Sequence, residues 1–206
     1  MLEKRWLKRQ ADMVRTADYI DPDLYRKFGV KRGLRNADGT GVLVGLTTIG
    51  NVHGYVMNEG EKQPIPGELF YRGIDVRDIV QADKREHRFG YEETAYLLLF
   101  GELPSARDLV DWKNTLGVYR KLSDGFKENA IMRNPSKDIM NAIARAVLFA
   151  YAFDEGGHPD DISLEKCLSQ SIELIGAIPT IAAYAYQAKA HYHLGQSLLI
   201  RNPDPR

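Results

Sequence analysis

The sequence predicts a mainly α-helical protein with a small β element in its N-terminal part. From residue 75 to residue 193, apolar residues recur at helical spacing between capping residues and glycines. Between residues 41 and 73, β-branched residues form short runs around a Gly-Asn pair and two prolines. With 206 residues, the chain can bury one substantial core. We therefore expect an N-terminal helical arm over residues 1–40, followed by one multi-helical domain over residues 41–206.

Two helices are expected in the arm. A weak apolar stripe indicates the first, from Glu3 to about Thr16. The second begins at Asp21-Pro22, because an aspartate can cap free amide groups and a proline needs no N–H in the first turn. Gly29 supplies a left-handed exit. The arm is basic without interleaved aromatic residues, which favours a solvated helical surface over a nucleic-acid site.

The β element is predicted as three short strands. Residues 42–49 and 52–57 are rich in β-branched residues, and Gly50-Asn51 between them is typical of a tight turn. Pro64 and Pro66 are expected to break the chain before the third strand, at residues 69–71.

Helices follow from residue 75 onward. Asp75 is placed to cap a helix that runs through Gln81, and Tyr91 to Phe100 forms the next helix, ended by Gly101. Ser105 resembles the cap of a helix that runs to about Lys121. A shorter helix is predicted over residues 125–132.

Ser136 is predicted to cap a helix that ends near Phe153. In it Ala142, Ala146 and Ala150 recur at every fourth residue, and such small residues let a second helix approach closely.

The polar segment 154–161 contains Gly and Pro and is predicted to be a loop. Helix resumes from Ser163 through Ile178, is kinked or restarted at Pro179, and continues to Ala190. The sequence shows neither a repeat at solenoid spacing nor a low-complexity tract.

Charge and cysteine content narrow the possible functions. Lys+Arg and Asp+Glu number 28 each, so the balance of charge does not favour nucleic acid or an anionic membrane as a partner. Cys167 is the sole cysteine, which excludes an internal disulfide and favours a reducing compartment. Its helical context predicts a buried, inert thiol.

No apolar run reaches the length of a membrane helix, and we expect a cytoplasmic protein without a membrane partner.

The candidate ligand-binding features are a glycine-rich segment and one arginine. Gly39-Thr40-Gly41 with Gly45 superficially resembles a nucleotide-binding loop, but it precedes a strand rather than a helix, which favours a turn. Arg35 is a candidate for an anionic ligand such as a coenzyme A phosphate; its alternative is an exposed arginine in a flexible arm. No binding residue for a cofactor is secure.

The five histidines do not form a recognisable metal site. His53 and His87 are expected at the surface. His158 lies near three aspartates and could form a metal site, but a hydrophilic loop is favoured since nothing fixes a ligand geometry. His191 and His193 are two residues apart, which on a helix directs them to different faces. We therefore predict no metal.

Two ordered motifs resemble the citrate synthase family. The first is Tyr71-Arg72-Gly73-Ile74 before a short acidic-capped helix, and the second is the helix from Glu93 to Phe100 with its Gly101-Glu102-Leu103-Pro104 exit. Residues 41–47 and the stretch Ala177 to Tyr184, which resembles the family's proline-containing helix, support the likeness. It runs from about Gly41 to His193.

The resemblance implies an acyltransferase with a large and a small helical domain, active as a homodimer. Such enzymes condense acetyl-CoA with oxaloacetate, using an aspartate base and histidines that stabilise charge developing on oxygen. No covalently bound cofactor is implied, and acetyl-CoA is a substrate of the full-length enzyme.

The family's catalytic residues lie in a histidine-containing helix and in His-Gly-Gly-Ala-Asn, Gly-His-Arg and Asp-Pro-Arg segments. The first three are not among these 206 residues, and Asp204-Pro205-Arg206 matches the last in letters only. Hence no catalytic residue is assigned in this chain, and Asp204 is not carried over as the base. We expect the N-terminal part of the large domain without the small catalytic domain.

Three readings of function follow. The first is an N-terminal fragment of a citrate synthase, inactive alone, and the second is the same part of a 2-methylcitrate synthase. The third is a non-catalytic helical module that dimerises on this fold. The helix with the alanine repeat matches in order a family helix at the dimer two-fold, so we expect it to remain an association surface.

Overall fold

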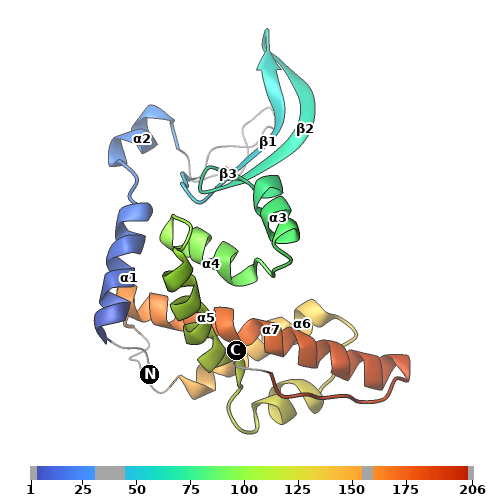
Figure 1. The fold of residues 1–206 in the computed structure, drawn as a ribbon. Coiled ribbons are helices and arrows are strands. Elements are labelled where there is room, and N and C mark those ends of the chain that lie inside the picture. The colour runs from blue at the N-terminus through green and yellow to red at the C-terminus, as the bar shows by residue number, and fades with distance from the viewer. Residues whose placement is uncertain (1–3, 31–44, 155–159, 204–206) are drawn as a thin grey trace. The chain divides into compact units, whose positions relative to one another are not determined.

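The computed structural model describes residues 4–30, 45–154 and 160–203 and is mainly helical, with one small antiparallel sheet (Figure 1). The predicted fold class is thereby confirmed. The described elements are, in chain order, α1 (Lys4–Ala17), α2 (Pro22–Lys27), β1 (Gly50–Asn58), β2 (Glu61–Tyr71), β3 (Ile74–Asp75), α3 (Val76–Arg85), α4 (Tyr91–Phe100), α5 (Ala106–Arg120), the π-helix η1 (Lys127–Met132), α6 (Ile139–Ala150), the 3-10 turn η2 (Tyr151–Phe153) and α7 (Leu164–Leu194).

The chain divides into two compact units. One, here the sheet unit, comprises residues 9–105; the other, the helical unit, comprises residues 1–8 and 106–206. Helix α1 contributes residues to both.

A long β-hairpin dominates the sheet unit, and its turn is not where the sequence predicted it. Strand β1 pairs antiparallel with β2, and the turn lies at Glu59-Gly60, where φ is +50° and +85°. Two successive positive φ angles match the twist of the flanking strands. Gly50 and Asn51 instead pair with Tyr71 and Phe70 in the ladder. The predicted turn at Gly50-Asn51 is therefore wrong, and residues 45–49 form no strand.

The prolines of β2 do not break the chain, contrary to the prediction. Pro64 lies opposite Tyr55, and the register shifts between His53 and Tyr55. Strand β3 pairs only with Phe70 and Tyr71, so in the described residues this part of β2 has a single neighbouring strand. A proline is tolerated there because its missing N–H costs no ladder hydrogen bond on the open edge.

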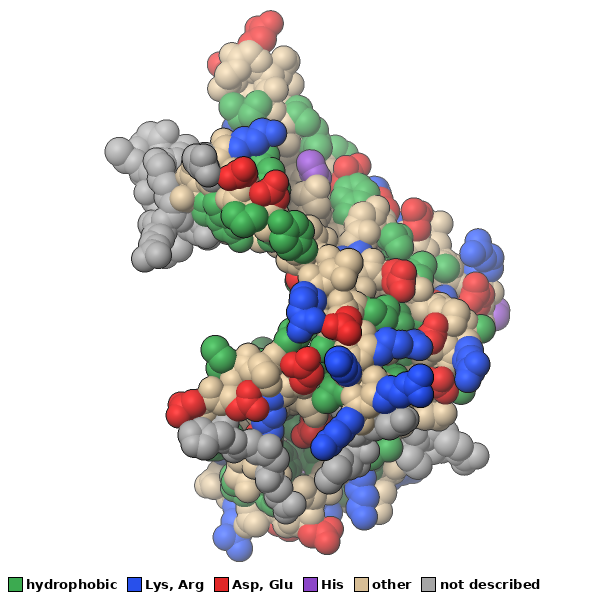
Figure 2. Space-filling view, turned by 90° about the vertical axis from the view of Figure 1, so that its left-hand side faces the viewer, with side chains coloured by type: hydrophobic (Ala, Val, Ile, Leu, Met, Phe, Trp, Pro, Cys, Tyr) green, Lys and Arg blue, Asp and Glu red, His purple; other side chains and the backbone are tan. Residues whose placement is uncertain are grey.

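Within the described residues, most of the hairpin is open to solvent, and only residue 65 and residues 68–71 of β2 are half-buried. All nine residues of β1 are exposed, and Val52, the most exposed of its large apolar residues, retains 76% of its accessible surface. Figure 2 shows these apolar side chains beside charged ones at the top of the view. The residues with high β propensity therefore form a hairpin that stays largely exposed in this unit.

Helices α3 and α4 follow the sequence prediction closely. The Asp75 carboxylate accepts a hydrogen bond from the Arg77 amide at 2.8 Å and caps α3, which continues four residues beyond Gln81. Helix α4 spans the predicted residues and ends at Gly101, which takes the left-handed conformation at φ +88°. It buries Tyr96, Leu97 and Phe100.

The helical unit is built on α7. Its start is capped by the Ser163 hydroxyl, which accepts a hydrogen bond from the Lys166 amide, and it continues through Pro179 as one helix. Helix α5 packs on it and buries Trp112 and Leu116, each 1% exposed. The Thr180 hydroxyl donates to the Arg120 carbonyl oxygen at 2.8 Å and ties the end of α5 to α7.

The alanine repeat of α6 lies inside this unit. Ala142 and Ala146 are buried in a core cluster with Ile181, Ala185 and Ala188 of α7. The close approach that the small residues predicted is therefore made to a helix of the same chain. Met140 and Leu148 of α6 remain exposed.

The cap of α6 is Asp138 rather than Ser136. The Asp138 carboxylate accepts from the amides of Met140 and Asn141, at 2.9 and 3.3 Å. The Ser136 hydroxyl accepts from the Asp138 amide, two residues before the cap. Both residues carry a capping side chain, and only the position at which helical dihedrals begin decides between them.

Asp138→Ala is expected to lower the free energy of unfolding by about 1 kcal/mol, since two amides of the first turn lose their acceptor. Urea denaturation followed by circular dichroism measures the change. Ser136→Ala is the comparison and should cost less than half as much, because its hydroxyl binds an amide outside the helix. A larger loss in Ser136→Ala would place the cap where the sequence predicted it.

Candidate functional site

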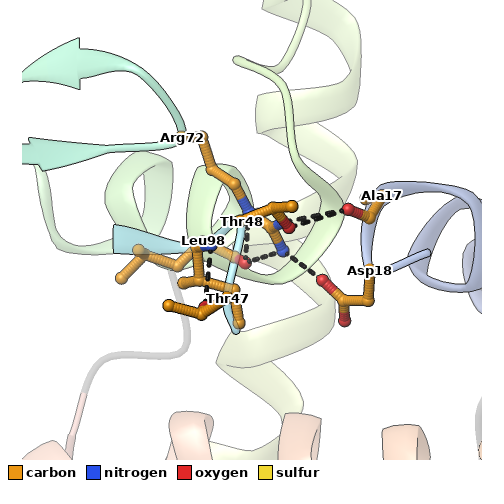
Figure 3. Close-up of polar contacts among 7 residues, drawn as sticks. Ala17, Asp18, Thr47, Thr48, Arg72 and Leu98 are labelled. Carbon is orange, nitrogen blue, oxygen red and sulfur yellow. Dashed lines mark hydrogen bonds and ion pairs between the residues drawn. The ribbon is translucent and has the colours of Figure 1, made fainter. Parts of the chain in front are cut away.

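Arg72, within the motif Tyr71-Arg72-Gly73-Ile74, joins four segments of the sheet unit (Figure 3). Its Nε and Nη2 atoms donate to the Leu98 carbonyl oxygen at 3.1 and 2.7 Å. Nη1 donates to the Thr48 hydroxyl at 3.0 Å and to the Ala17 carbonyl oxygen at 3.3 Å. Nη2 also pairs with the Asp18 carboxylate at 2.8 Å. One guanidinium thus donates hydrogen bonds to the end of α1, to α4 and to the segment before β1.

The surroundings of Arg72 explain why arginine suits this position. Its side chain is 4% exposed, so unpaired donors would be costly. The carbonyls of Ala17 and Leu98 lie in the last turns of α1 and α4, where a cation is favoured by the helix dipole. The guanidinium supplies five donors in a planar fork, which lysine does not. We infer that Arg72 organises the sheet unit and does not bind a ligand directly.

A pocket of about 350 Å³ lies within the helical unit. Its walls are largely apolar and aromatic and include a few polar side chains. The residues that line it come from the end of α5, the segment up to η1, the end of α6, η2 and α7, namely Tyr119, Lys121, Leu122, Ser123, Phe126, Val147, Ala150, Tyr151, Phe153, Asp154, Gln170, Glu173, Leu174 and Ala177.

Two carboxylates of this pocket differ in their partners. Asp154 Oδ1 pairs with Lys166 Nζ at 2.7 Å, and Asp154 Oδ2 accepts from Gln170 Nε2 at 2.6 Å. Glu173 has a long contact, at 3.4 Å, from the Ser169 hydroxyl to Oε1. Burial, and secondarily the Asp154 charge, raise the pKa of Glu173. Burial, then the Glu173 charge, likewise raise the pKa of Tyr119.

No described histidine lines this pocket. His53 lies in the exposed strand β1, and His87 follows α3 with φ +51°. His191 Nδ1 lies 2.8 Å from the Gln196 carbonyl oxygen, and His193 Nε2 lies 3.3 Å from the Pro135 carbonyl oxygen. These two histidines therefore contact different backbone carbonyl oxygens.

One sequence prediction about the thiol is wrong. Cys167 is exposed, whereas a buried thiol was predicted. It falls between Lys166 and the buried Leu168 on α7, so the helix turns it outward. A helical pattern alone left open which face this residue would take.

Several candidates lie outside the described residues: Arg35, Gly39-Thr40-Gly41, His158 and Asp204-Pro205-Arg206. In the part of the chain that is described, no three His, Cys, Asp or Glu side chains are placed to hold a metal ion. Nor does any described helix have the length and apolar character needed to cross a bilayer.

Comparison with known families decides the relationship. The family model described as "Citrate synthase, C-terminal domain" matches residues 35–204. This chain belongs to the citrate synthase family. Within the family match lie both the Arg72 motif and the pocket-lining helices.

Curated relatives agree with this citrate synthase assignment. The chain is 28% identical over 125 residues to the citrate synthase of Corynebacterium glutamicum, covering 60% of this chain and 26% of the relative. It is 30% identical over 122 residues to the citrate synthase of Haloferax volcanii, covering 58% and 31%. Identity to the 2-methylcitrate synthase of Shewanella oneidensis is 30% over 119 residues, covering 58% and 29%. The chain thus spans about a quarter to a third of the relatives it matches.

Solved citrate synthase structures share the fold. A ternary complex of carboxymethyl coenzyme A and oxaloacetate with the citrate synthase of Thermoplasma acidophilum matches with a TM-score of 0.53 at 25% identity, over 72% of this chain and 34% of that one. The citrate synthase of Pyrobaculum aerophilum matches with a TM-score of 0.50 at 24% identity, over 83% and 40%. The family resemblance drawn from the sequence is confirmed.

Sequence reasoning noted the Arg72 motif but missed its structural role, and it missed the pocket altogether. For the pocket no local signal existed. Tyr119 and Glu173 are far apart in sequence, and only helix packing brings their side chains to one cavity.

Proposed function

We propose that this chain forms part of the large domain of a citrate synthase, an acyltransferase that condenses acetyl-CoA with oxaloacetate to give citrate and coenzyme A. The family match over residues 35–204 carries this proposal. The likeness to the Thermoplasma enzyme, whose structure holds a coenzyme A analogue and oxaloacetate, supports the substrate class. As proposed, the protein acts in the cytoplasm and needs no covalently bound cofactor.

The proposed role of these 206 residues is scaffold and association surface. The family's His-Gly-Gly-Ala-Asn and Gly-His-Arg segments are not in the sequence, so we assign no catalytic acid, base or electrophile here. Association as a homodimer is proposed as well. The outer surface of α6 and η2 supports it, because Met140, Leu148 and Tyr151 are 72%, 78% and 64% exposed.

The 206-residue chain alone is expected to release no coenzyme A from acetyl-CoA and oxaloacetate above the rate without protein. Free thiol formation, followed with a chromogenic disulfide at several protein concentrations, measures this. Sustained release that scales with protein concentration would contradict the proposal that these 206 residues hold no catalytic acid or base.

Reading the gene separates a citrate synthase from a non-catalytic module. A frame that continues past codon 206 into a His-Gly-Gly-Ala-Asn segment supports the enzyme, whereas a stop codon favours a dimerising helical module. Analytical ultracentrifugation of the chain tests self-association in either case.

A 2-methylcitrate synthase is the alternative that the Shewanella relative supports. The product of a continuing frame, assayed with acetyl-CoA and with propionyl-CoA, distinguishes the two by the ratio of kcat/KM. A preference for acetyl-CoA supports citrate synthase, and a preference for propionyl-CoA supports the alternative.

A further inference from the structure

The pocket of the helical unit has the size and the lining of a small-molecule site. Its volume of about 350 Å³ lies at the lower end of the range found for ligand pockets. The apolar part includes Leu122, Phe126, Val147 and Ala177. The rings of Phe126 and Phe153 are 5.7 Å apart between centroids and tilted by 43°. An apolar body of a few carbon atoms, or one aromatic ring, suits such walls.

The charged residues that line the pocket carry a net negative charge, with two carboxylates against one lysine. Of its two carboxylates, Asp154 is compensated, because Lys166 and Gln170 engage both of its oxygens. Glu173 is half-buried and has no ion pair among the described residues. Lys121 also lines the pocket, but it is exposed. A carboxylate desolvated in this way is stabilised by an added cation more than a solvated one would be.

We propose that this pocket binds a small primary amine, with the ammonium group at the Glu173 carboxylate and the apolar body against Phe126 and Phe153. The aromatic walls contact the apolar body, while the carboxylate attracts the ammonium group. An anionic ligand of the same shape would be repelled by the Glu173 carboxylate and is disfavoured. This proposal does not depend on the proposed function.

The pH dependence of binding follows from the same geometry. Burial, and then the Asp154 charge, raise the pKa of Glu173, whereas the Lys166 charge and the Ser169 contact lower it. A bound ammonium lowers this pKa further because it stabilises the ionised form. The amine is protonated over the whole range of interest. Affinity should therefore be full above the pKa of Glu173 in the free protein and decline as the pH falls through it.

Benzylamine is the probe, titrated into the full 206-residue chain and followed by two-dimensional NMR and calorimetry. We expect saturable binding with chemical-shift changes at Phe126, Gln170 and Glu173. Benzyl alcohol has the same shape without the charge and should bind about tenfold more weakly, as the loss of a charged hydrogen bond implies. Equal affinity for the two probes, or absence of saturable benzylamine binding, would overturn the proposal.

Glu173→Gln tests the carboxylate itself, since it keeps the size of the side chain. Benzylamine should bind about tenfold more weakly to this variant, and benzyl alcohol should bind unchanged. Glu128→Gln is the matched control, an exposed glutamate of the same unit outside the pocket lining. If Glu173→Gln does not fold, the wild-type comparison of probes between pH 4 and pH 8 still decides. Affinity independent of pH over that range would overturn the proposal.

Discussion

Replacing Arg72 with methionine is expected to lower the free energy of unfolding by about 3 kcal/mol. Methionine fills much of the same space but donates nothing, so the carbonyl oxygens of Ala17 and Leu98 lose a charged donor. Asp18, 41% exposed, can turn to water, which limits the loss from the ion pair. Urea denaturation followed by far-ultraviolet circular dichroism measures the difference.

Two further substitutions show whether the geometry or only the charge of Arg72 matters. Arg72→Lys keeps the charge and should lose most of the same stability, because three ammonium donors cannot reproduce the planar fork. Arg77→Met is the matched control. That arginine is 61% exposed and pairs with Asp75 and Glu68 at the surface, so its loss should cost much less stability than the loss of Arg72. Equal losses at Arg72 and Arg77 would refute the organising role of Arg72.

Gly176→Ala is expected to destabilise the protein by about 2 to 3 kcal/mol, although alanine usually stabilises a helix relative to glycine. A Cβ atom at this position would lie 2.7 Å from Tyr119 Cβ and 2.8 Å from the Leu116 carbonyl oxygen. The second of these is backbone and cannot rotate away. Helices α5 and α7 would have to separate, which loosens the packing around Leu116.

Thermal or urea denaturation of Gly176→Ala measures this effect. Gly67→Ala provides the control, because a Cβ there meets no atom within 4 Å. That change should be neutral or stabilise by up to about 1 kcal/mol, since it reduces the conformational freedom of the unfolded chain. A stabilised Gly176→Ala would mean that the two helices do not cross as closely as the structure shows.

Local signals in the sequence accounted for most of the secondary structure. Asp75, Gly101 and Ser163 mark helix ends through contacts with residues a few positions away, and all three act as predicted. The hairpin turn was misplaced for a related reason. Gly50-Asn51 and Glu59-Gly60 both permit a turn, and pairing along the whole ladder selects the second.

Functional features divide in the same way. The family could be read from Tyr71-Arg72-Gly73-Ile74 and the helix that ends at Gly101, since these are contiguous in sequence. The pocket and the exposure of Cys167 could not, because each depends on which helix faces are covered. The alanine repeat of α6 predicted a close helix contact but did not specify the partner, and the structure places α7 there.

By itself, then, the sequence determined the helical class, most element boundaries and the citrate synthase relationship. Tertiary structure alone decided the partners of Arg72, 55 residues from Ala17, and the meeting of Tyr119 with Glu173 in one cavity. The physical reason is the distance along the sequence over which each feature is determined. Caps, turns and helical periodicity depend on neighbours within one or two turns, whereas desolvation and close packing depend on residues that only the folded chain brings together.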